Sequence, residues 1–314
     1  MKGARGDFWR FFGGARIPLV RRLRAQHDGH VKTLWQLNVV IAKANTEAFC
    51  DWVRAEWAIE PVAMERPHGD HAVVNMYFDS RSVAHARQRA AAGFDGLISA
   101  HVLPCHEKEW TTFWRHHFRV LDIGRRLRIV PIWEKAPDRK RLNLKIDPGL
   151  SFGTGDHFTT RFCLEALEAA CDAIRPKSML DAGTGSGILA IAAAKLGVPR
   201  IAAFDNDPVC VKQSRKNAIL NRLGAKRIRF FEADVLAHGW ETPAADIVCA
   251  NILTPILIQA APALWRATRR QLMLTGIRET EGDSVAQAFH ELGAREILRD
   301  GDGEWCGLVF ARRN

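Results

Sequence analysis

The feature that most constrains the fold is a glycine-rich turn, Gly183-Thr184-Gly185-Ser186-Gly187, between a short apolar strand pattern and an alanine-rich helix pattern. Glycine lets the backbone turn sharply from strand to helix and lets a ligand approach the main chain closely. Strand and helix patterns alternate on both sides of this turn, from about residue 146 to the C-terminus. The alternation predicts an α/β domain with a doubly wound, mostly parallel sheet.

The expected elements of this domain follow from periodicity and from capping residues. Helices are predicted over 157–174, 188–196, 208–220, 255–267 and 283–292. Strands are predicted over 178–181, 200–204, 227–231, 246–250, 271–274, 295–298 and 305–310. The last two strands are too close in sequence for a parallel crossover, so we expect the last strand to be antiparallel.

The chain has 314 residues, which is long enough for two domains. Residues 33–103 show a different order, with strand patterns at 34–41, 61–65, 71–78 and 97–103, and helix patterns at 45–58 and 80–92. This βαββαβ order predicts a small α+β domain of the ferredoxin-like type. The sequence thus indicates a basic arm at 1–30, this domain at 31–105, a linker at 106–145 and the α/β domain at 146–314.

Basic residues outnumber acidic residues, 45 to 35, which gives a net charge of +10. Such an excess is typical of proteins with nucleic acid or another anionic partner. Residues 1–30 contain seven basic and two acidic residues, so half of the excess lies in this arm. The arm fits either a loosely folded basic tail or a mitochondrial transit peptide with little serine. A weak contact of the arm with ribosomal RNA is one expectation.

The predicted linker interleaves aromatic and basic residues, among them Trp110, Trp114, Arg115 and Arg119. Such a pattern occurs in platforms that stack single-stranded nucleic acid. The alternative, which we favour, is that the aromatic residues pack between domains while the basic residues face solvent. Residues 136–141 suit a linker or turn.

Cysteine and histidine spacing excludes several classes of protein. The seven cysteines are scattered without a C-x-x-C pair, and no H-E-x-x-H motif is present. The pattern argues against a disulfide framework and a zinc site, and favours a reducing compartment, the cytoplasm. No apolar run is long enough to span a membrane. We expect no bound metal.

Acidic and amide residues follow the predicted strands of the α/β domain. Asp181 precedes the glycine turn, and its carboxylate suits a cationic ligand. Ile188 stands where the dinucleotide fingerprint has its third glycine, and this difference disfavours NAD or FAD as the ligand. Asp205 ends the next strand, where a carboxylate can accept ribose hydroxyls. Asp234, after the third strand, is the candidate to reach an adenine amino group. Asn251 lies at the carboxyl end of the fourth strand, where its amide can orient an amine.

Each of these sites has a plainer reading. The residues after Asp205 suit a helix cap, with Asp207 capping and Pro208 in the first turn, and both readings can hold together. Asn251 can belong to an ordinary turn before a helix. The glycine-rich segment 147–160 can fold over a ligand or serve as a flexible connector. His157 within it can accept a proton or only support the loop.

Taken together, several segments resemble one family, the ribosomal protein L-eleven methyltransferases of the PrmA type. The resemblance is carried by DPGLSFGTGDHFTT (147–160), LDAGTGSGILAIAAAKLG (180–197), DNDP (205–208), SRKNAILN (214–221) and ADIVCANIL (245–253). It covers about residues 110–276. It implies a class I methyltransferase that uses S-adenosylmethionine, with a ferredoxin-like domain that recognises the ribosomal protein.

By position, the resemblance implies that Thr160, Gly183, Asp205 and Asn251 contact the cofactor, with Asn251 also at the catalytic edge. Gly185 of the same glycine turn is a further candidate for cofactor contact. The sequence departs from the family where Asp156-His157-Phe158 stands for T-H-P and where Thr184 stands for cysteine. The arm has no counterpart in the family pattern.

The expected function is transfer of methyl groups to amino groups, on lysine side chains or an N-terminal amine, of a large-subunit ribosomal protein. Two alternatives are an RNA methyltransferase and a lysine methyltransferase with a non-ribosomal substrate. A non-catalytic adaptor that keeps the fold is a further alternative. Asn251→Ala should abolish turnover and leave cofactor binding measurable.

Overall fold

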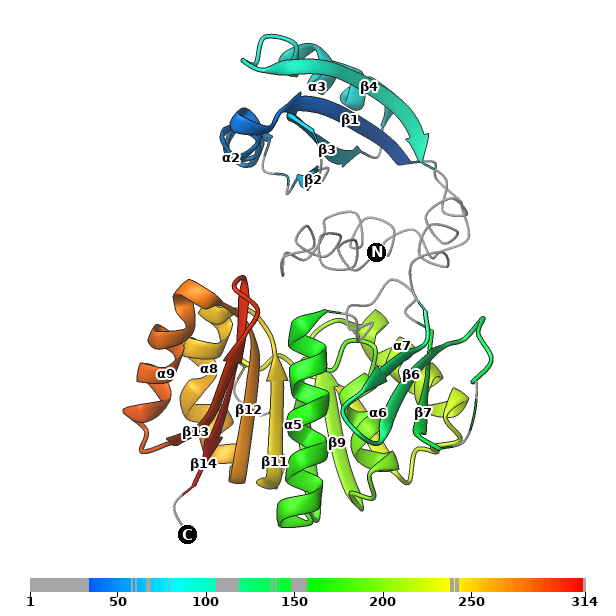
Figure 1. The fold of residues 1–314 in the computed structure, drawn as a ribbon, viewed down its shortest axis with the longest axis vertical. Helices are drawn as coiled ribbons and strands as arrows, with labels where there is room; N and C mark the ends of the chain where they lie inside the picture. The colour runs from blue at the N-terminus through cyan, green and yellow to red at the C-terminus, as the bar shows by residue number, and fades with distance from the viewer. Residues whose placement is uncertain are drawn as a thin grey trace. The chain divides into compact units, whose positions relative to one another are not determined.

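A computed structural model describes residues 34–57, 59, 61–65, 69–78, 80–105, 119–136, 138, 140–147, 157–237, 240 and 243–312. The chain divides into two compact units, residues 1–117 and 118–314. The predicted arm of residues 1–30 and most of the glycine-rich segment 147–160 lie outside the described residues. The two units are described separately (Figure 1).

The first unit has the predicted βαββαβ order. Its elements are β1 (Leu34–Ala42), α2 (Thr46–Trp57), β2 (Val62–Glu65), β3 (His71–Phe78), α3 (Arg81–Ala91) and β4 (Leu97–Cys105), with a 3-10 turn at Lys43–Asn45. The four strands form an antiparallel sheet in the order β2-β3-β1-β4. This is the strand order of a ferredoxin-like domain, so the prediction from periodicity is confirmed.

The core of the first unit lies on one face of this sheet. Leu37, Val39 and Ile41 alternate along β1 and are fully buried, together with Phe49 and Val53 of α2. The two-residue period of the strand and the three-to-four-residue period of the helix therefore bring both apolar faces to one core.

The second unit is built on a seven-stranded sheet in the order β10-β9-β8-β11-β12-β14-β13. Its strands are β8 (Ser178–Ala182), β9 (Arg200–Asp205), β10 (Ile228–Glu232), β11 (Ala245–Asn251), β12 (Thr268–Arg278), β13 (Arg295–Gly301) and β14 (Trp305–Ala311). Its helices are α5 (Phe158–Ile174), α6 (Ile188–Lys195), α7 (Pro208–Leu220), α8 (Thr254–Ala267) and α9 (Gly282–His290). β14 pairs antiparallel with β12 and β13, and the pairs among β8 to β12 are parallel. The predicted antiparallel last strand is confirmed.

Helices pack on both faces of this sheet (Figure 1). Met179 of β8 belongs to the core shared with α5, α6 and α7, whereas its neighbour Leu180 belongs to the core shared with α8 and α9. Cys249 and Ala250 of β11 divide between the two cores in the same way. Because both faces are covered, these strands carry continuous apolar runs.

A three-stranded sheet occupies residues that the sequence assigned to a linker. Its strands are β5 (Leu121–Ile123), β6 (Leu127–Pro131) and β7 (Leu142–Ile146), with β5 antiparallel and β7 parallel to β6. Ile129 and Leu144 are fully buried in the core shared with α5 and α6. β7 also lies against α6, which explains why that helix is apolar on all sides. The linker prediction of 106–145 is therefore corrected for residues 121–145, while residues 106–118 lie outside the described part.

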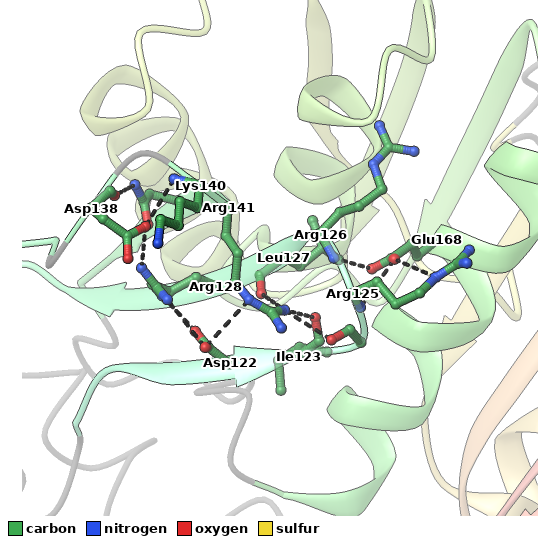
Figure 2. A network of polar contacts seen from close by, with 12 residues as sticks. Asp122, Ile123, Arg125, Arg126, Leu127, Arg128, Asp138, Lys140, Arg141 and Glu168 are labelled. Atoms are coloured by element: carbon green, nitrogen blue, oxygen red, sulfur yellow. Dashed lines mark hydrogen bonds and ion pairs between the residues drawn. The ribbon is translucent and has the colours of Figure 1, made fainter.

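Figure 2 shows how this small sheet is fastened to α5. The buried carboxylate of Glu168 on α5 accepts the backbone N–H groups of Arg125 at 3.1 Å and Arg126 at 3.2 Å, in the β5–β6 turn. Arg128 on β6 is bonded to the Asp122 carboxylate on β5, at 3.1 Å through its Nη2. One arginine of the predicted linker, Arg128, is thus paired with a carboxylate inside the second unit.

The described residues contain neither a membrane-spanning helix nor a metal-binding cluster. No helix there is long and apolar enough to cross a bilayer. No group of three or more His, Cys, Asp or Glu side chains there is arranged to hold a metal ion.

Candidate functional site

The glycine-rich turn follows β8 and takes a left-handed backbone that glycine adopts without strain. The φ angle is +74° at Gly183, +54° at Gly185 and +83° at Gly187. The Gly183 amide donates to the carbonyl oxygen of Phe204 at 2.9 Å, which ties the turn to β9. A Cβ atom on Gly183 would lie 2.5 Å from Cγ2 of Ile252, so this position has no room for a side chain.

Asp205 ends β9 and lies against the glycine turn. Its side chain is held at both oxygens, since Oδ2 accepts the Gly185 N–H at 2.9 Å and Oδ1 accepts the Asp207 N–H at 3.0 Å. Asp207 in turn accepts the Val209 N–H at 2.8 Å and caps α7. The structure thus shows the predicted cap at Asp207 and leaves Asp205 as a fixed carboxylate, 9% exposed, at the end of the strand.

Asn251 ends β11 at the same edge, because the carboxyl ends of parallel strands lie together. Its amide Nδ2 donates to Thr159 Oγ1 at 3.3 Å. Nδ1 of His157 lies 2.8 Å from that hydroxyl and also accepts the Thr159 backbone N–H at 3.4 Å. Since Nδ1 is an acceptor, the Thr159 hydroxyl donates to it and accepts from Asn251.

This relay fixes the orientation of the Asn251 amide. The amide nitrogen faces Thr159, so the Oδ1 atom is the group left to accept a bond from a ligand. His157 is buried against the edge of the Trp305 ring, with ring centroids 5.2 Å apart. Burial lowers the pKa of His157 to about 4, so the ring is neutral at pH 7. Its position at the start of α5 favours the supporting role over proton transfer.

Thr160 is the predicted site residue on α5. Its side chain is fully enclosed, and its hydroxyl has no hydrogen-bond partner among the residues that the structure describes. A buried hydroxyl without a partner is costly, by about 1–3 kcal/mol. Thr160 therefore fits a residue whose partner is a ligand.

Asp181 is a buried carboxyl immediately before the glycine turn. Its Oδ2 accepts the Thr184 hydroxyl at 2.6 Å. Burial raises the pKa of Asp181 to about 7, and the nearby Asp205 carboxylate adds to the rise. A cationic group close to Asp181 would favour its ionised form.

Asp234 is the predicted site residue with the weakest structural link to the others. It lies in the turn after β10, and its Oδ1 accepts the Leu236 N–H at 2.9 Å. The preceding Ala233 donates its N–H to the Asp205 carbonyl at 3.1 Å. The Asp234 carboxylate is exposed and, within the described residues, bonds to none of the other predicted site residues.

Asn217 on α7 is a residue whose role the sequence reasoning missed. Its Nδ2 donates to the Ser186 carbonyl in the glycine turn at 2.8 Å and to the Asp147 carbonyl at 3.1 Å, while Oδ1 accepts the Asp147 N–H at 3.0 Å. Asn217 thereby joins the glycine turn to the end of the chain segment that follows β7. The available signal was an asparagine inside a helix, a position that asparagine disfavours without a specific partner.

The comparisons with known proteins agree on one family. A family model described as ribosomal protein L11 methyltransferase (PrmA) matches residues 25–313. A protein named ribosomal protein L11 methyltransferase from Pelobacter propionicus is 36% identical over 257 residues, 76% of this chain and 81% of its own length. Its namesake from Thiobacillus denitrificans is 40% identical over 256 residues, 81% of this chain and 83% of its own length.

A solved structure supports the same assignment. The crystal structure of ribosomal protein L11 methylase from Lactobacillus delbrueckii subsp. bulgaricus is 32% identical, with a TM-score of 0.57. The alignment covers 63% of this chain and 100% of that chain. The family match extends well beyond the motifs at 110–276 and begins after most of the basic arm. The chain belongs to the ribosomal protein L11 methyltransferase family.

Proposed function

We propose that this protein transfers methyl groups from S-adenosylmethionine to amino groups of ribosomal protein L11. The observation that carries the proposal is the meeting, at one edge of the sheet, of a glycine turn with left-handed backbone, the fixed carboxylate of Asp205 and the oriented amide of Asn251. The choice of substrate is supported by relatives named for L11 methylation that are 36% and 40% identical.

The residues at this edge fit S-adenosylmethionine. Gly183 and Gly185 are half-buried and carry no side chain, so a ligand can approach the backbone of the turn. Asp205 can accept hydrogen bonds from the two ribose hydroxyls. The Thr160 hydroxyl, which has no hydrogen-bond partner among the described residues, can bond the ligand, and Asp181 suits a ligand with positive charge. Asp234 remains our candidate for the adenine amino group. When bound, the cofactor supplies an electrophilic methyl group on its sulfonium.

The protein's own task is to present an uncharged amine in line with that methyl group. A partly dry site lowers the pKa of an amine, which favours the neutral form. Asn251 Oδ1 accepts one amine N–H and so directs the nitrogen lone pair, because Thr159 holds the other end of the amide. Transfer would join the methyl carbon to this nitrogen in place of its bond to sulfur, and the proton lost by the amine would pass to water.

The proposal also covers the rest of the chain. The ferredoxin-like unit recognises the protein substrate, as the family resemblance implies, and the enzyme acts in the cytoplasm, where its substrate is made. A contact of the basic arm with ribosomal RNA is an additional proposal, and the arm lies outside the described residues.

Transfer of labelled methyl groups to purified L11 and to naked ribosomal RNA tests this function. We expect label in L11 and none in RNA. Label in RNA alone would support an RNA methyltransferase, and label in another protein but not in L11 would support a different substrate. Failure to bind S-adenosylmethionine in a calorimeter would support an adaptor without chemistry.

A further inference from the structure

The amino-terminal ends of the strands in the second unit carry a concentration of basic residues. In a parallel sheet these strand ends, and the helix ends that lead into them, share one edge, opposite the carboxyl edge that holds Asp205 and Asn251. The antiparallel strand β14 ends at the same edge, since its Ala311 lies opposite Gln271 and Arg295. We call this set of twelve residues the basic edge: Arg175, Lys177, Lys195, Arg200, Arg222, Lys226, Arg227, Arg266, Arg269, Arg270, Arg295 and Arg312.

Few acidic residues accompany them. In the described helix-to-strand connections and the first two residues of each strand, the carboxylates are Glu291, Asp246 and Glu296, and Asp246 accepts the backbone N–H of Lys177 at 2.6 Å. Twelve cations against three carboxylates leave an excess of nine positive charges at this edge. This edge of the second unit is therefore strongly positive.

The cations of the basic edge are not neutralised within the unit. Among the described residues none of them forms an ion pair with a carboxylate. Arg270 donates to the Ile174 carbonyl at 2.7 Å, and Arg312 to the Trp265 carbonyl at 2.6 Å, contacts that hold each guanidinium in place and leave its charge intact. Burial and the neighbouring charges of Arg222 and Lys145 lower the pKa of Lys195. The mutual repulsion of these cations, which carboxylates of the unit do not offset, indicates a surface suited to an anionic partner.

The basic edge is also hollowed. A cavity of about 590 Å³ opens between the end of α5 and strands β12, β13 and β14, and Arg270, Arg295 and Arg312 contribute to its lining. The volume falls in the range of ligand sites, about 300–1,000 Å³. Three arginines around one hollow suit an oxyanion such as phosphate, which guanidinium groups bind through paired N–H donors.

The opposite edge has the reverse charge. Strands β8 to β10 end on carboxylates, which include Asp181, Asp205, Glu232 and Asp234. An acidic edge suits a cationic cofactor and a lysine-bearing substrate. The basic edge on the far side of the same sheet therefore calls for a different, anionic partner.

We propose that the basic edge binds the phosphate backbone of RNA. Seven strands about 4.8 Å apart make an edge about 29 Å wide, long enough to follow several consecutive phosphates. Nine of its twelve cations are arginines, which favour phosphate over other anions. No aromatic side chain is among the exposed large apolar residues of the described part, which disfavours insertion into a membrane surface. The choice of RNA over DNA rests on the proposed function, because a ribosomal protein assembles with RNA.

The test compares two charge-reversed variants of the full-length protein that carry the same net charge. The edge variant is Arg200→Glu, Arg269→Glu and Arg295→Glu. The matched control is Lys135→Glu, Lys212→Glu and Lys216→Glu, three exposed cations of the second unit that do not belong to the basic edge. Binding of a fluorescein-labelled ribosomal RNA fragment is followed by anisotropy from about 50 to about 200 mM KCl, the range over which phosphate contacts weaken strongly.

We expect the edge variant to bind the RNA at least about tenfold more weakly, with a salt slope shallower by about 3, and the control to change the slope by less than about 1. Both variants should methylate free L11 as the wild type does, so a failure of the proposed function shows up separately. Equal weakening in both variants, or no RNA binding by the wild type, overturns the proposal. Binding to phosphatidylserine vesicles or to polyglutamate with no binding to RNA also overturns it.

Discussion

Replacement of Asp181 by asparagine removes a carboxyl group whose pKa is raised by burial. Asp181 is 1% exposed, and burial raises its pKa from an ordinary value of 3.8 to about 7. The folded protein therefore holds this proton more tightly than the unfolded chain does. By linkage, the contribution of Asp181 to stability is fully present below about pH 4 and is lost as the pH rises through about 7.

The magnitude follows from the difference between the two pKa values. At about 1.4 kcal/mol per pKa unit, the full loss is about 4 kcal/mol, of which about 2–3 kcal/mol falls between pH 5 and pH 8. Asparagine has nearly the same shape and no proton to lose. We therefore expect the free energy of unfolding of the wild type to fall by about 2–3 kcal/mol more than that of Asp181→Asn over this interval.

Urea unfolding of both proteins at pH 5 and pH 8 provides the measurement. Asp300→Asn, which alters an exposed aspartate on β13, is the control and should follow the wild type. Parallel changes in wild type and Asp181→Asn between the two pH values would refute the reasoning from burial. A second readout is the affinity for S-adenosylmethionine, which should rise through pH 7 in the wild type and stay flat in the variant.

Two further substitutions test the geometry of the site. Gly183→Ala should lose measurable binding of S-adenosylmethionine in a calorimeter, because its Cβ would lie 2.5 Å from Ile252. The control Gly293→Ala, with φ +80° and nothing within 4 Å of the added Cβ, should keep this binding. Equal binding by the two variants would show that the close approach at Gly183 is unimportant. Asn217→Ala should lower the free energy of unfolding by about 1–3 kcal/mol, because it leaves buried backbone groups without partners. Gln287→Ala, which removes an exposed bond to a side chain, should change it by less than about 0.5 kcal/mol, and a similar loss in both variants would contradict the role of Asn217.

Much of the fold was predictable because its elements have regular periods and recognisable ends. The glycine turn, the cap at Asp207 and the closely spaced last strands each follow from local chemistry. The sheet of β5 to β7 was not predictable in this way, because its strands have only three to five residues and pair within a stretch that also carries aromatic and basic residues. The fully apolar α6 was a sign that a further layer covers it.

The site was predictable to the extent that parallel strands end at one edge. That rule brings Gly183, Asp205 and Asn251 together from the sequence alone. The contact of Asn251 with Thr159 joins residues 92 positions apart, and no local pattern indicates it. Sequence spacing also could not show that His157 is buried and turned toward its own helix.

The central claim is tested most directly by the intact mass of ribosomal protein L11 after incubation with S-adenosylmethionine and this protein. We predict that L11 gains whole methyl increments with the wild type and none with Asn251→Ala, while the variant still binds S-adenosylmethionine in a calorimeter. An unchanged mass of L11 with cofactor-bound wild type would contradict the proposed function. Undiminished methylation by Asn251→Ala would contradict the role of its amide.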